Sequence, residues 1–248
     1  MEPKMQVVII GGTSGIGLAL ARHYLNQGHQ VEVTGRDIEK IPESLYCANL
    51  SFSQFDVCSK NEIQCYFESR KNQPIDIFIY CAGKYFTQAR YDLTEYEIQQ
   101  VTGVNGSGFL HCFKLAAAKM QAQNKPAYLV AISSVAGVIR SSNPTLYAQL
   151  KAQMISVAEQ YRNKLSQNNI SVTVIAPHYM NTQKLRDLKG GENPKKAFLM
   201  EESTAVAHIV KAIEAKEALA IFPWQIKWMV KGLNLLPLEL VRWILNKR

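Results

Sequence analysis

Short apolar runs alternate with segments of helical period along most of this chain, and this alternation is the strongest constraint on its fold. The apolar runs span residues 5–10, 30–34, 50–56, 75–80, 127–133, 170–176 and 218–222. The helical segments between them span residues 16–27, 60–70, 95–121, 145–165 and 203–216. Strands that are apolar on both faces and alternate with helices are typical of a parallel sheet covered on both sides. The sequence therefore predicts an α/β fold with a doubly wound parallel sheet of about seven strands, which binds ligands beyond the carboxyl ends of its strands.

The length and composition favour one domain. The chain has 248 residues, of which 47% are apolar, enough for a sizeable core. No low-complexity segment, repeat or linker divides it. We expect residues 1–222 to form the dinucleotide-binding and catalytic domain, and residues 223–248 to form an amphipathic helical tail that belongs to this domain or to an interface.

The cysteines and the N-terminal segment bear on the compartment of the protein. The five cysteines form no Cys-x-x-Cys pair, which indicates reduced thiols in a cytoplasmic protein, without disulfides or a bound metal. Lys4 and the uncharged run from Met5 to Ala21 imitate a signal peptide. Four glycines interrupt this run where a signal peptide has its apolar core. A strand, a turn and a helix therefore explain the segment better.

A glycine-rich turn follows the first apolar run. In IIGGTSGIG, Gly11, Gly15 and Gly17 are spaced Gly-x-x-x-Gly-x-Gly and open the first predicted helix. Gly11 permits a tight turn, Gly15 lets a pyrophosphate approach the helix N-terminus, and Gly17 allows close contact between helix and sheet. A turn that merely needs glycine is the alternative, but the position between a strand and a helix favours a dinucleotide site.

Four polar residues further along the chain form a second pattern. Tyr147 and Lys151, in YAQLK, lie four residues apart on one face of a predicted helix. Ser134 lies thirteen residues before Tyr147, at the end of the fifth predicted strand, and Asn105 lies in the helix after the fourth strand. Together with the glycine turn, this order resembles the short-chain dehydrogenase/reductase family over roughly residues 5–222. The resemblance implies a Rossmann-type fold and an oxidoreductase.

The resemblance also implies how these residues act in carbonyl reduction. Tyr147 would donate the proton, and the Lys151 ammonium would hold the nicotinamide ribose and lower the pKa of the phenol from its usual value near ~10. Ser134 would hydrogen-bond the substrate oxygen, and Asn105 would hold a water that relays protons to Lys151. Two alternatives stay open. In the first, Ser133 takes the active-site role in place of Ser134. In the second, Asn105 has no catalytic role and only kinks its helix.

Residues after the second predicted strand bear on the choice of cofactor. An NAD site has a carboxylate at this strand end for the ribose 2′-hydroxyl, whereas Thr34 and Gly35 stand there and Arg36 follows. Because a guanidinium suits a 2′-phosphate, we expect NADP(H) in preference to NAD(H). In the alternative, Arg36 is a solvated charge and Asp37 turns inward to bind NAD.

The family resemblance extends the cofactor site to further strand ends and turns. With Arg36, it implies a site made of Gly11, Thr13, Ser14, Gly15, Ile16, Gly17, Asp56, Val57, Cys81, Ala82, Gly83, Tyr147, Lys151, Pro177 and Thr182. Asp56 would lie near the adenine amino group. Tyr80 and Cys81 replace two asparagines of the family pattern, which puts in doubt how the central sheet is held there. His178 replaces a glycine and is either a pocket wall or a proton carrier.

These patterns together predict an NADP(H)-dependent carbonyl reductase or alcohol dehydrogenase with a small, apolar carbonyl or alcohol substrate. A cofactor-sensing protein without turnover is the alternative, which Tyr80, Cys81 and His178 favour and the four intact polar residues oppose. The polar segment 183–198, with two adjacent glycines, predicts a lid over the substrate. Because the family tends to form dimers or tetramers, we expect a homodimer or homotetramer.

The tail carries half of the formal charge of +8: its basic residues are Lys227, Lys231, Arg242, Lys247 and Arg248, against Glu239 alone. A basic surface attracts phosphates, nucleic acid or anionic lipid, but no recognisable nucleic-acid module is present, so we expect no nucleic-acid partner. Two amphipathic helices are expected, the second with Leu238, Val241 and Leu245 on one stripe. Neither approaches the ~20 apolar residues of a membrane span. The tail either packs on its own domain or a twin subunit, or lies on an anionic membrane.

Overall fold

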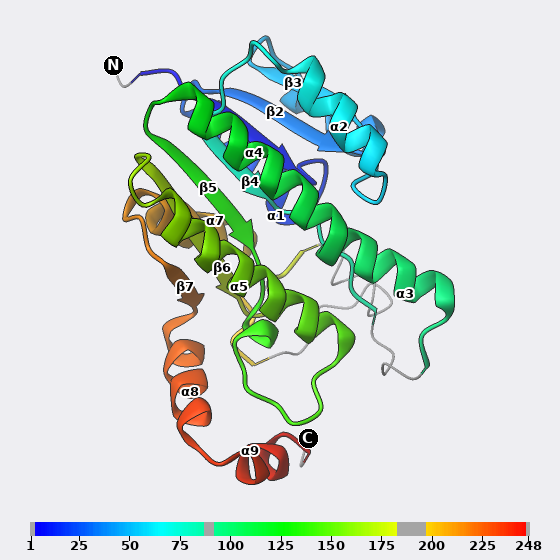
Figure 1. Cartoon of the computed structure of the whole chain (residues 1–248), viewed down its shortest axis with the longest axis vertical. Helices are drawn as coiled ribbons and strands as arrows, with labels where there is room; N and C mark the ends of the chain where they lie inside the picture. The colour runs from blue at the N-terminus through cyan, green and yellow to red at the C-terminus, as the bar shows by residue number, and fades with distance from the viewer. Residues whose placement is uncertain (1–2, 87–91, 183–196, 247–248) are drawn as a thin grey trace.

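The computed structural model describes residues 3–86, 92–182 and 197–246, and it contains the predicted parallel sheet (Figure 1). Seven strands pair in parallel in the order β3-β2-β1-β4-β5-β6-β7. The order reverses beside β1, which is the point where doubly wound sheets bind ligands. The strands are β1 (Gln6–Ile10), β2 (Gln30–Gly35), β3 (Leu50–Gln54), β4 (Ile77–Tyr80), β5 (Ala127–Ile132), β6 (Ile170–Pro177) and β7 (Leu219–Phe222).

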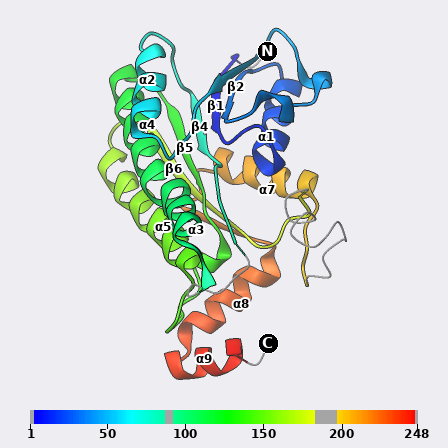
Figure 2. The ribbon, with the colours of Figure 1, turned by 90° about the vertical axis from the view of Figure 1, so that its right-hand side faces the viewer.

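Helices cover both faces of this sheet. Figure 2 shows α1 (Gly15–Asn26) and α7 (Glu202–Glu214) on one face, and α2 (Lys60–Ser69), α4 (Phe109–Gln123) and α5 (Leu146–Leu165) on the other. The Rossmann-type fold that the apolar alternation predicts is therefore confirmed, and the N-terminal run forms a strand, a turn and a helix. None of the five cysteines, all within the described ranges, takes part in a disulfide.

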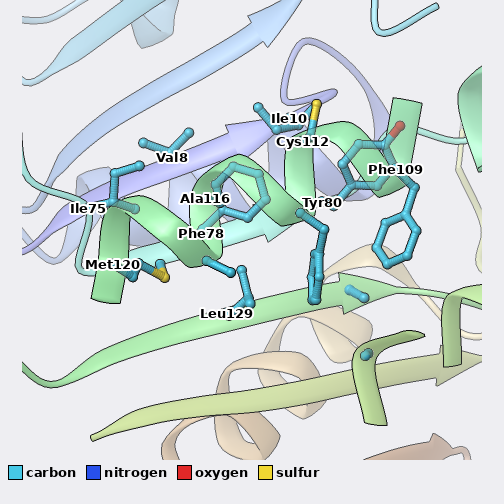
Figure 3. Close-up of a cluster of buried hydrophobic side chains, with 14 of the residues drawn as sticks. Val8, Ile10, Ile75, Phe78, Tyr80, Phe109, Cys112, Ala116, Met120 and Leu129 are labelled. Atoms are coloured by element: carbon cyan, nitrogen blue, oxygen red, sulfur yellow. The ribbon is translucent and has the colours of Figure 1, made fainter. Parts of the chain in front are cut away.

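Successive residues of the central strands pack into different cores. Val8 and Ile10 of β1 belong to the cluster beneath α2, α4 and α5. Figure 3 shows this cluster, with Val8, Ile10 and Phe78 of β4 labelled. Val7 and Ile9 belong to the cluster beneath α1 and α7. Because side chains along a strand alternate between the faces of a sheet, a strand covered on both sides must be apolar at every position. This requirement explains the continuous apolar runs of the sequence.

The long helix that we expected after the fourth strand is interrupted, which corrects that prediction. α3 (Glu95–Thr102) and α4 are joined by the π-helical segment Gly103–Gly108. A Cβ at Gly108 would contact the carbonyl oxygen of Val57, so the turn after β3 packs directly on this segment. π-Helical turns inside helices occur frequently at functional sites.

Tyr80 ties the end of β4 to the π-helical segment. Its side chain is completely buried, and its ring meets that of Phe109 edge to face at 5.3 Å. Its hydroxyl donates a hydrogen bond of 2.6 Å to the carbonyl oxygen of Val104. The backbone nitrogen of Cys81 donates to the carbonyl oxygen of Ile10 at 2.9 Å. The sheet is thus held at this point by a phenol and a backbone bond, where the family pattern has asparagines.

The tail forms two helices, α8 (Trp224–Leu235) and α9 (Leu238–Asn246), at the end of the molecule opposite the N-terminus (Figure 1). Within the ranges that the structure describes, no helix has the length and apolar character to cross a membrane. The predicted apolar stripe of the second helix is only partly correct, because Val241 is buried whereas Leu238 is 37% exposed. The side chain of Leu245 lies outside the described part.

The first tail helix packs on its own domain. Ile226 and Val230 are buried in a small cluster with Val135, which follows β5. The Asn234 amide nitrogen donates to the carbonyl oxygen of Val138 at 3.0 Å. Apolar contact and hydrogen bonding therefore fix α8 against the segment after β5.

Two glycine substitutions test the packing of the π-helical segment. Gly108 has ordinary helical angles (φ −61°, ψ −46°), so Ala fits its backbone, but the added methyl would press on Val57. We expect Gly108→Ala to lower the free energy of unfolding by about 1–3 kcal/mol.

Gly232 in α8 is the control, because a Cβ there meets no described atom within 4 Å. Gly232→Ala should raise that free energy by about 0.5–1 kcal/mol. Urea unfolding followed by circular dichroism measures both, and shifts in the same direction would contradict the packing argument.

Candidate active site

The glycine turn holds the end of β1 against two neighbouring strands. Gly11 has a φ of +79°, in the region that favours glycine. A Cβ at Gly11 would lie 2.7 Å from the backbone nitrogen of Ala82, and one at Gly17 would contact the Gly11 carbonyl oxygen. The backbone nitrogens of Gly11 and Gly12 both donate to the Thr34 carbonyl oxygen at 3.1 Å. Side chains at these glycines would therefore push the turn away from the sheet.

The N-terminus of α1 fits an anionic group. Ser14 caps the helix with extended backbone angles, and its hydroxyl makes no capping hydrogen bond to the described backbone of the helix. The first turn contains no acidic residue, so the helix dipole and the backbone amides attract negative charge there. A Cβ at Gly15 would lie 3.8 Å from the Thr182 side chain, its nearest described neighbour. The predicted pyrophosphate site thus lies between the glycine turn and the segment after β6.

Asp37 is engaged by residues that directly follow it in the turn after β2. Its carboxylate accepts a hydrogen bond of 3.0 Å from the backbone nitrogen of Glu39, and it lies 3.6 Å from the Lys40 ammonium. These partners cap the short helix that follows Asp37. These contacts occupy the carboxylate in this structure, and the alternative in which Asp37 turns inward to bind NAD stays a prediction.

Arg36 lies beside the predicted adenine-side residue. Its side chain is 60% exposed, and its Nη1 atom is 4.0 Å from the Asp56 carboxylate. A Cβ at Gly35, where an NAD site has its carboxylate, would lie 2.7 Å from the side chain of Thr13. An acidic side chain at this strand end would therefore require Thr13 to shift, while a guanidinium stands one residue further on.

The other predicted cofactor residues lie at the ends of β3 and β4 or in the turn. Val57 packs against the core from the turn after β3, and Ala82 lies against the glycine turn. Cys81 is half-buried and is held by its backbone bond to β1. The Ile16 side chain is buried in the core beneath α1, so only its backbone faces the turn.

Ser134, Tyr147 and Lys151 come together beyond the end of β5. Ser134 caps the short helical turn Val135–Gly137, and its side chain lies close enough to Tyr147 to act on the pKa of the phenol. The Lys151 Nζ atom lies 5.6 Å from the centroid of the Tyr147 ring. It donates a hydrogen bond of 3.0 Å to the carbonyl oxygen of Ile132. The predicted spacing therefore places a hydroxyl, a phenol and an ammonium in one site.

Ser133 faces the other way. Its hydroxyl is buried and donates to the backbone carbonyl oxygen of Lys151 at 2.8 Å, so it fastens β5 to α5. Of the two adjacent serines, Ser134 is the one whose side chain acts on the pKa of Tyr147. The thirteen-residue spacing thus selects the serine that the structure places in the site.

Burial raises the pKa of Tyr147 to about 12. The Ser134 side chain acts in the opposite direction, and the neighbouring phenols Tyr85 and Tyr179 add to the upward shift. We expected the Lys151 ammonium to lower the pKa of this phenol below its usual value. The net shift is upward, because removal of the phenolate from water outweighs the favourable neighbours. The phenol is therefore held in its protonated form, which is the form that can donate a proton.

Asn105 lies inside the π-helical segment and is completely buried. Its amide nitrogen donates to the carbonyl oxygens of Lys84 at 2.7 Å and Val101 at 3.1 Å. Its amide oxygen accepts from the backbone nitrogen of Lys84 at 3.4 Å, and a Cβ at Gly83 would lie 3.6 Å from that oxygen. The structure thus shows Asn105 fastening the segment after β4 to the interrupted helix. Its role in a water relay stays a prediction.

Two aromatic residues beside Tyr147 were not singled out from the sequence. The ring of Tyr85, from the segment after β4, meets that of Tyr147 edge to face at 5.0 Å. Tyr179 follows β6, acts on the pKa of Tyr147, and packs edge to face on His178 at 4.8 Å. The sequence signal that could have indicated a role in the site is their position shortly after the ends of β4 and β6. His178 therefore lies in an aromatic wall of the site.

The segment after β6 is held by backbone contacts. Pro177 ends the strand, Met180 pairs with Met200 in an isolated bridge, and the Thr182 nitrogen donates to the Met180 carbonyl oxygen at 2.8 Å. These contacts place Thr182 opposite the glycine turn. The predicted lid 183–198 lies outside the described residues as far as residue 196.

Comparison with protein-family models agrees with this geometry. The model described as short chain dehydrogenase matches residues 5–193, well over half of the 248 residues. The chain therefore belongs to the short-chain dehydrogenase/reductase family of oxidoreductases.

Curated relatives cover the same part of the chain. The 3-oxoacyl-[acyl-carrier-protein] reductase MabA of Mycobacterium tuberculosis (strain ATCC 25618 / H37Rv) is 29% identical over 183 residues, which span 73% of this chain and 72% of the relative. Carbonyl reductase family member 4 of Xenopus laevis is 28% identical over 185 residues, which span 73% of this chain and 78% of the relative.

Solved structures share the fold at lower identity. A short chain dehydrogenase from Burkholderia cenocepacia J2315 in complex with NADP has a TM-score of 0.80 at 16% identity, over 93% of each chain. A short-chain dehydrogenase from Sphingobium yanoikuyae in complex with NADPH has a TM-score of 0.80 at 20% identity, over 93% of this chain and 92% of that one. The extent of these matches shows that the sheet and its helices follow the family fold.

The two adjacent serines provide a test of the site. Ser134→Ala removes the hydroxyl beside Tyr147, which also caps the turn Val135–Gly137. We expect it to lower kcat by about 10²-fold and the free energy of unfolding by about 1 kcal/mol. Ser133→Ala removes a buried bond between β5 and α5, and we expect it to lower the free energy of unfolding by about 1 kcal/mol. Steady-state kinetics and urea unfolding of both variants measure the two effects. An equal loss of activity in both variants would count against the assignment of Ser134.

Proposed function

We propose that this protein is an NADP(H)-dependent reductase that interconverts a carbonyl compound and an alcohol. The observation that carries the proposal is that three groups come together: Ser134 acts on the pKa of the Tyr147 phenol, and the Lys151 ammonium lies 5.6 Å from the centroid of the phenol ring. A carbonyl oxygen beside these two hydroxyls would accept hydrogen bonds from both. Such an arrangement favours the negative charge that develops on this oxygen during reduction.

Each residue has a distinct part in this reaction. NADPH, held by the glycine turn, would supply a hydride to the carbonyl carbon. Tyr147 gives its hydroxyl proton to the carbonyl oxygen, and Ser134 holds the same oxygen in place. The Lys151 ammonium stabilises the phenolate that remains on Tyr147, since opposite charges attract strongly in a buried site. In alcohol oxidation the same proton returns to Tyr147.

The preference for NADP(H) over NAD(H) rests on the end of β2. Arg36 is exposed there, Asp37 is engaged with Lys40, and an acidic side chain at Gly35 would require Thr13 to shift. A guanidinium binds a phosphate through charge-assisted hydrogen bonds, whereas a ribose 2′-hydroxyl gains little from it. The family structures that contain NADP or NADPH support the same preference.

An apolar ketone is the substrate class that fits best. Tyr85 and Tyr179 place aromatic rings beside the reacting phenol, and aromatic rings bind apolar groups. The relatives include a 3-oxoacyl-[acyl-carrier-protein] reductase and a carbonyl reductase family member, which supports a ketone on an acyl chain. As the family resemblance implies, the protein would act as a homodimer or homotetramer in the cytoplasm.

The loss of NADPH absorbance with a panel of ketones, aldehydes and 3-oxoacyl thioesters tests the reaction. Tyr147→Phe keeps the ring and removes the proton, so kcat should fall about 10²- to 10⁴-fold while NADPH affinity changes little. Tyr85→Phe is the control, because it keeps the ring that packs on Tyr147 and removes a hydroxyl that is not the proposed proton donor. NADPH binding without turnover of any compound, with Tyr147→Phe like the wild type, would favour a cofactor sensor.

The raised pKa of Tyr147 predicts different pH dependences for the two directions. Because the pKa is about 12, the phenol stays protonated at neutral pH, and reduction should lose no activity through Tyr147 between about pH 6 and 9. Oxidation needs the phenolate. As long as the pH lies below the pKa, the phenolate fraction rises tenfold with each unit by which the pH increases. The kcat/KM for oxidation should therefore rise with pH over the same range. A reduction rate that falls tenfold per pH unit there would contradict the assignment.

Arg36→Ala tests the cofactor preference. Loss of the guanidinium should raise KM for NADPH by about tenfold or more, since charge-assisted bonds to a phosphate contribute about 1.5–3 kcal/mol. KM for NADH should change little. Lys40→Ala is the matched control, because Lys40 is a nearby cation paired with Asp37. Equal changes for both cofactors in Arg36→Ala would show that Arg36 does not read the 2′-phosphate.

A further inference from the structure

All three tryptophans of the chain lie in the tail, and all three are exposed to solvent. Trp224 is 67% exposed, Trp228 is 63% exposed and Trp243 is 56% exposed. Leu235 and Leu240 of the same two helices are 86% and 42% exposed. Large apolar side chains that cluster on one surface mark a site of interaction with another apolar phase or molecule.

α8 has two apolar faces, and the domain uses one of them. Ile226 and Val230 pack on the segment after β5. Trp224, Trp228 and Leu235 are spaced four and seven residues apart, so they lie along one stripe of the helix. With 100° between successive residues, this stripe lies on the face opposite the buried one. Packing on the domain therefore leaves the tryptophan face uncovered.

Basic residues flank the exposed tryptophans. The Lys231 Nζ atom lies 4.9 Å from the Trp228 ring centroid, and Arg242 is exposed beside Trp243. A hollow of about 210 Å³ next to Trp224 is lined by Lys211 and Lys227, together with His208 and Glu217. Tryptophan beside lysine or arginine is typical of protein surfaces at the boundary between lipid headgroups and acyl chains.

We propose that the outer face of α8 and α9, made of Trp224, Trp228, Leu235, Leu240 and Trp243 with Lys227, Lys231 and Arg242, docks on an anionic lipid bilayer. The tryptophans and leucines would enter the boundary of the acyl chains, and the cations would meet the headgroup phosphates. Since neither helix can span a bilayer, the contact is peripheral.

Charge argues against a second copy of the chain as the occupant of this face. A twofold interface would place the same surface on both sides, so Lys227, Lys231 and Arg242 of both copies would lie in one interface. Glu239 is the one acidic residue of the tail sequence from Pro223 onward. A bilayer with anionic headgroups neutralises these cations, whereas a twin subunit would add to their repulsion.

The docking face lies close to the candidate active site. Ile226 and Val230 on the inner side of α8 pack against Val135, the residue after Ser134. If the proposed reductase function holds, an apolar carbonyl substrate would reach the site from the membrane surface. The docking itself does not depend on catalysis, so its test uses binding readouts that do not require turnover.

Intrinsic tryptophan fluorescence reports on this face alone, because the chain has no tryptophan elsewhere. Titration of the full-length protein with vesicles of phosphatidylcholine and phosphatidylglycerol should give a blue shift of the emission. Brominated acyl chains should quench it. Vesicles of phosphatidylcholine alone should bind much more weakly, and co-sedimentation with the same vesicles gives the bound fraction.

Matched variants separate the local surface from the overall charge. Lys227→Glu with Lys231→Glu should weaken binding to the anionic vesicles at least about tenfold. Each cation near such a surface contributes about 1 kcal/mol to the binding free energy. Lys114→Glu with Lys164→Glu, at exposed positions of α4 and α5, makes the same change in net charge and should retain most of the binding.

The apolar part of the contact has its own pair of variants. Trp224→Ala with Trp228→Ala should abolish most of the co-sedimentation. Tyr96→Ala, which removes an aromatic ring that is 67% exposed on α3, should leave it unchanged. Unfolding temperatures and turnover of a water-soluble ketone verify that each variant keeps its fold.

Three results would overturn the proposal. One is an absence of vesicle binding by the wild-type protein. Another is a concentration-dependent oligomer whose tryptophan emission is already blue-shifted and insensitive to vesicles, which would make a second copy the occupant. The third is binding of single-stranded RNA, lost in the same tail variants, without binding of lipid.

Discussion

The parallel sheet is buried on both faces, and the arrangement of the site follows from this constraint. Each central strand alternates its side chains between two cores, so Val8 and Ile10 face one set of helices while Val7 and Ile9 face the other. Polar groups have little place within such strands, because burial without a partner costs free energy. The chemistry of the protein therefore gathers where the strands end and their turns begin. The glycine turn, Arg36, Ser134 and Thr182 all follow strand ends.

Close packing brings these turns together and controls the charges between them. Lys151 is buried, and its ammonium is held by the carbonyl oxygen of Ile132. Asn105 fastens the segment after β4 to the π-helical segment. Tyr80, at the end of β4, bonds to Val104, the residue that precedes Asn105 in the same segment. The same burial that fixes these positions keeps Tyr147 protonated. A donor that must give up its proton during reduction is thus held in its acidic form, with a cation nearby to receive the developing phenolate.

The first tail helix connects the site to the outside of the molecule. Its inner face packs on the turn that begins at Ser134, and its hydrogen bonds to Val138 and Arg140 fix it there. The outer face keeps its tryptophans exposed, since one helix cannot turn both faces toward the same core. A surface that binds lipid would consequently lie one helix away from the reacting groups, and binding at this face would leave the catalytic residues untouched.

The sequence by itself determined the parallel sheet, the glycine turn and the order of Asn105, Ser134, Tyr147 and Lys151, because strand period, helix period and residue spacing are local properties of the chain. It did not show the interruption of the long helix, a segment that packs closely on Val57, far away in the sequence. Likewise, the spacing favoured Ser134 over Ser133, but only the fold shows which hydroxyl meets Tyr147. The upward shift of the Tyr147 pKa was not predictable, because charge can be read from residue types, whereas burial cannot. Tertiary structure alone decided these points, since each depends on atoms that folding brings together from separate strands and helices.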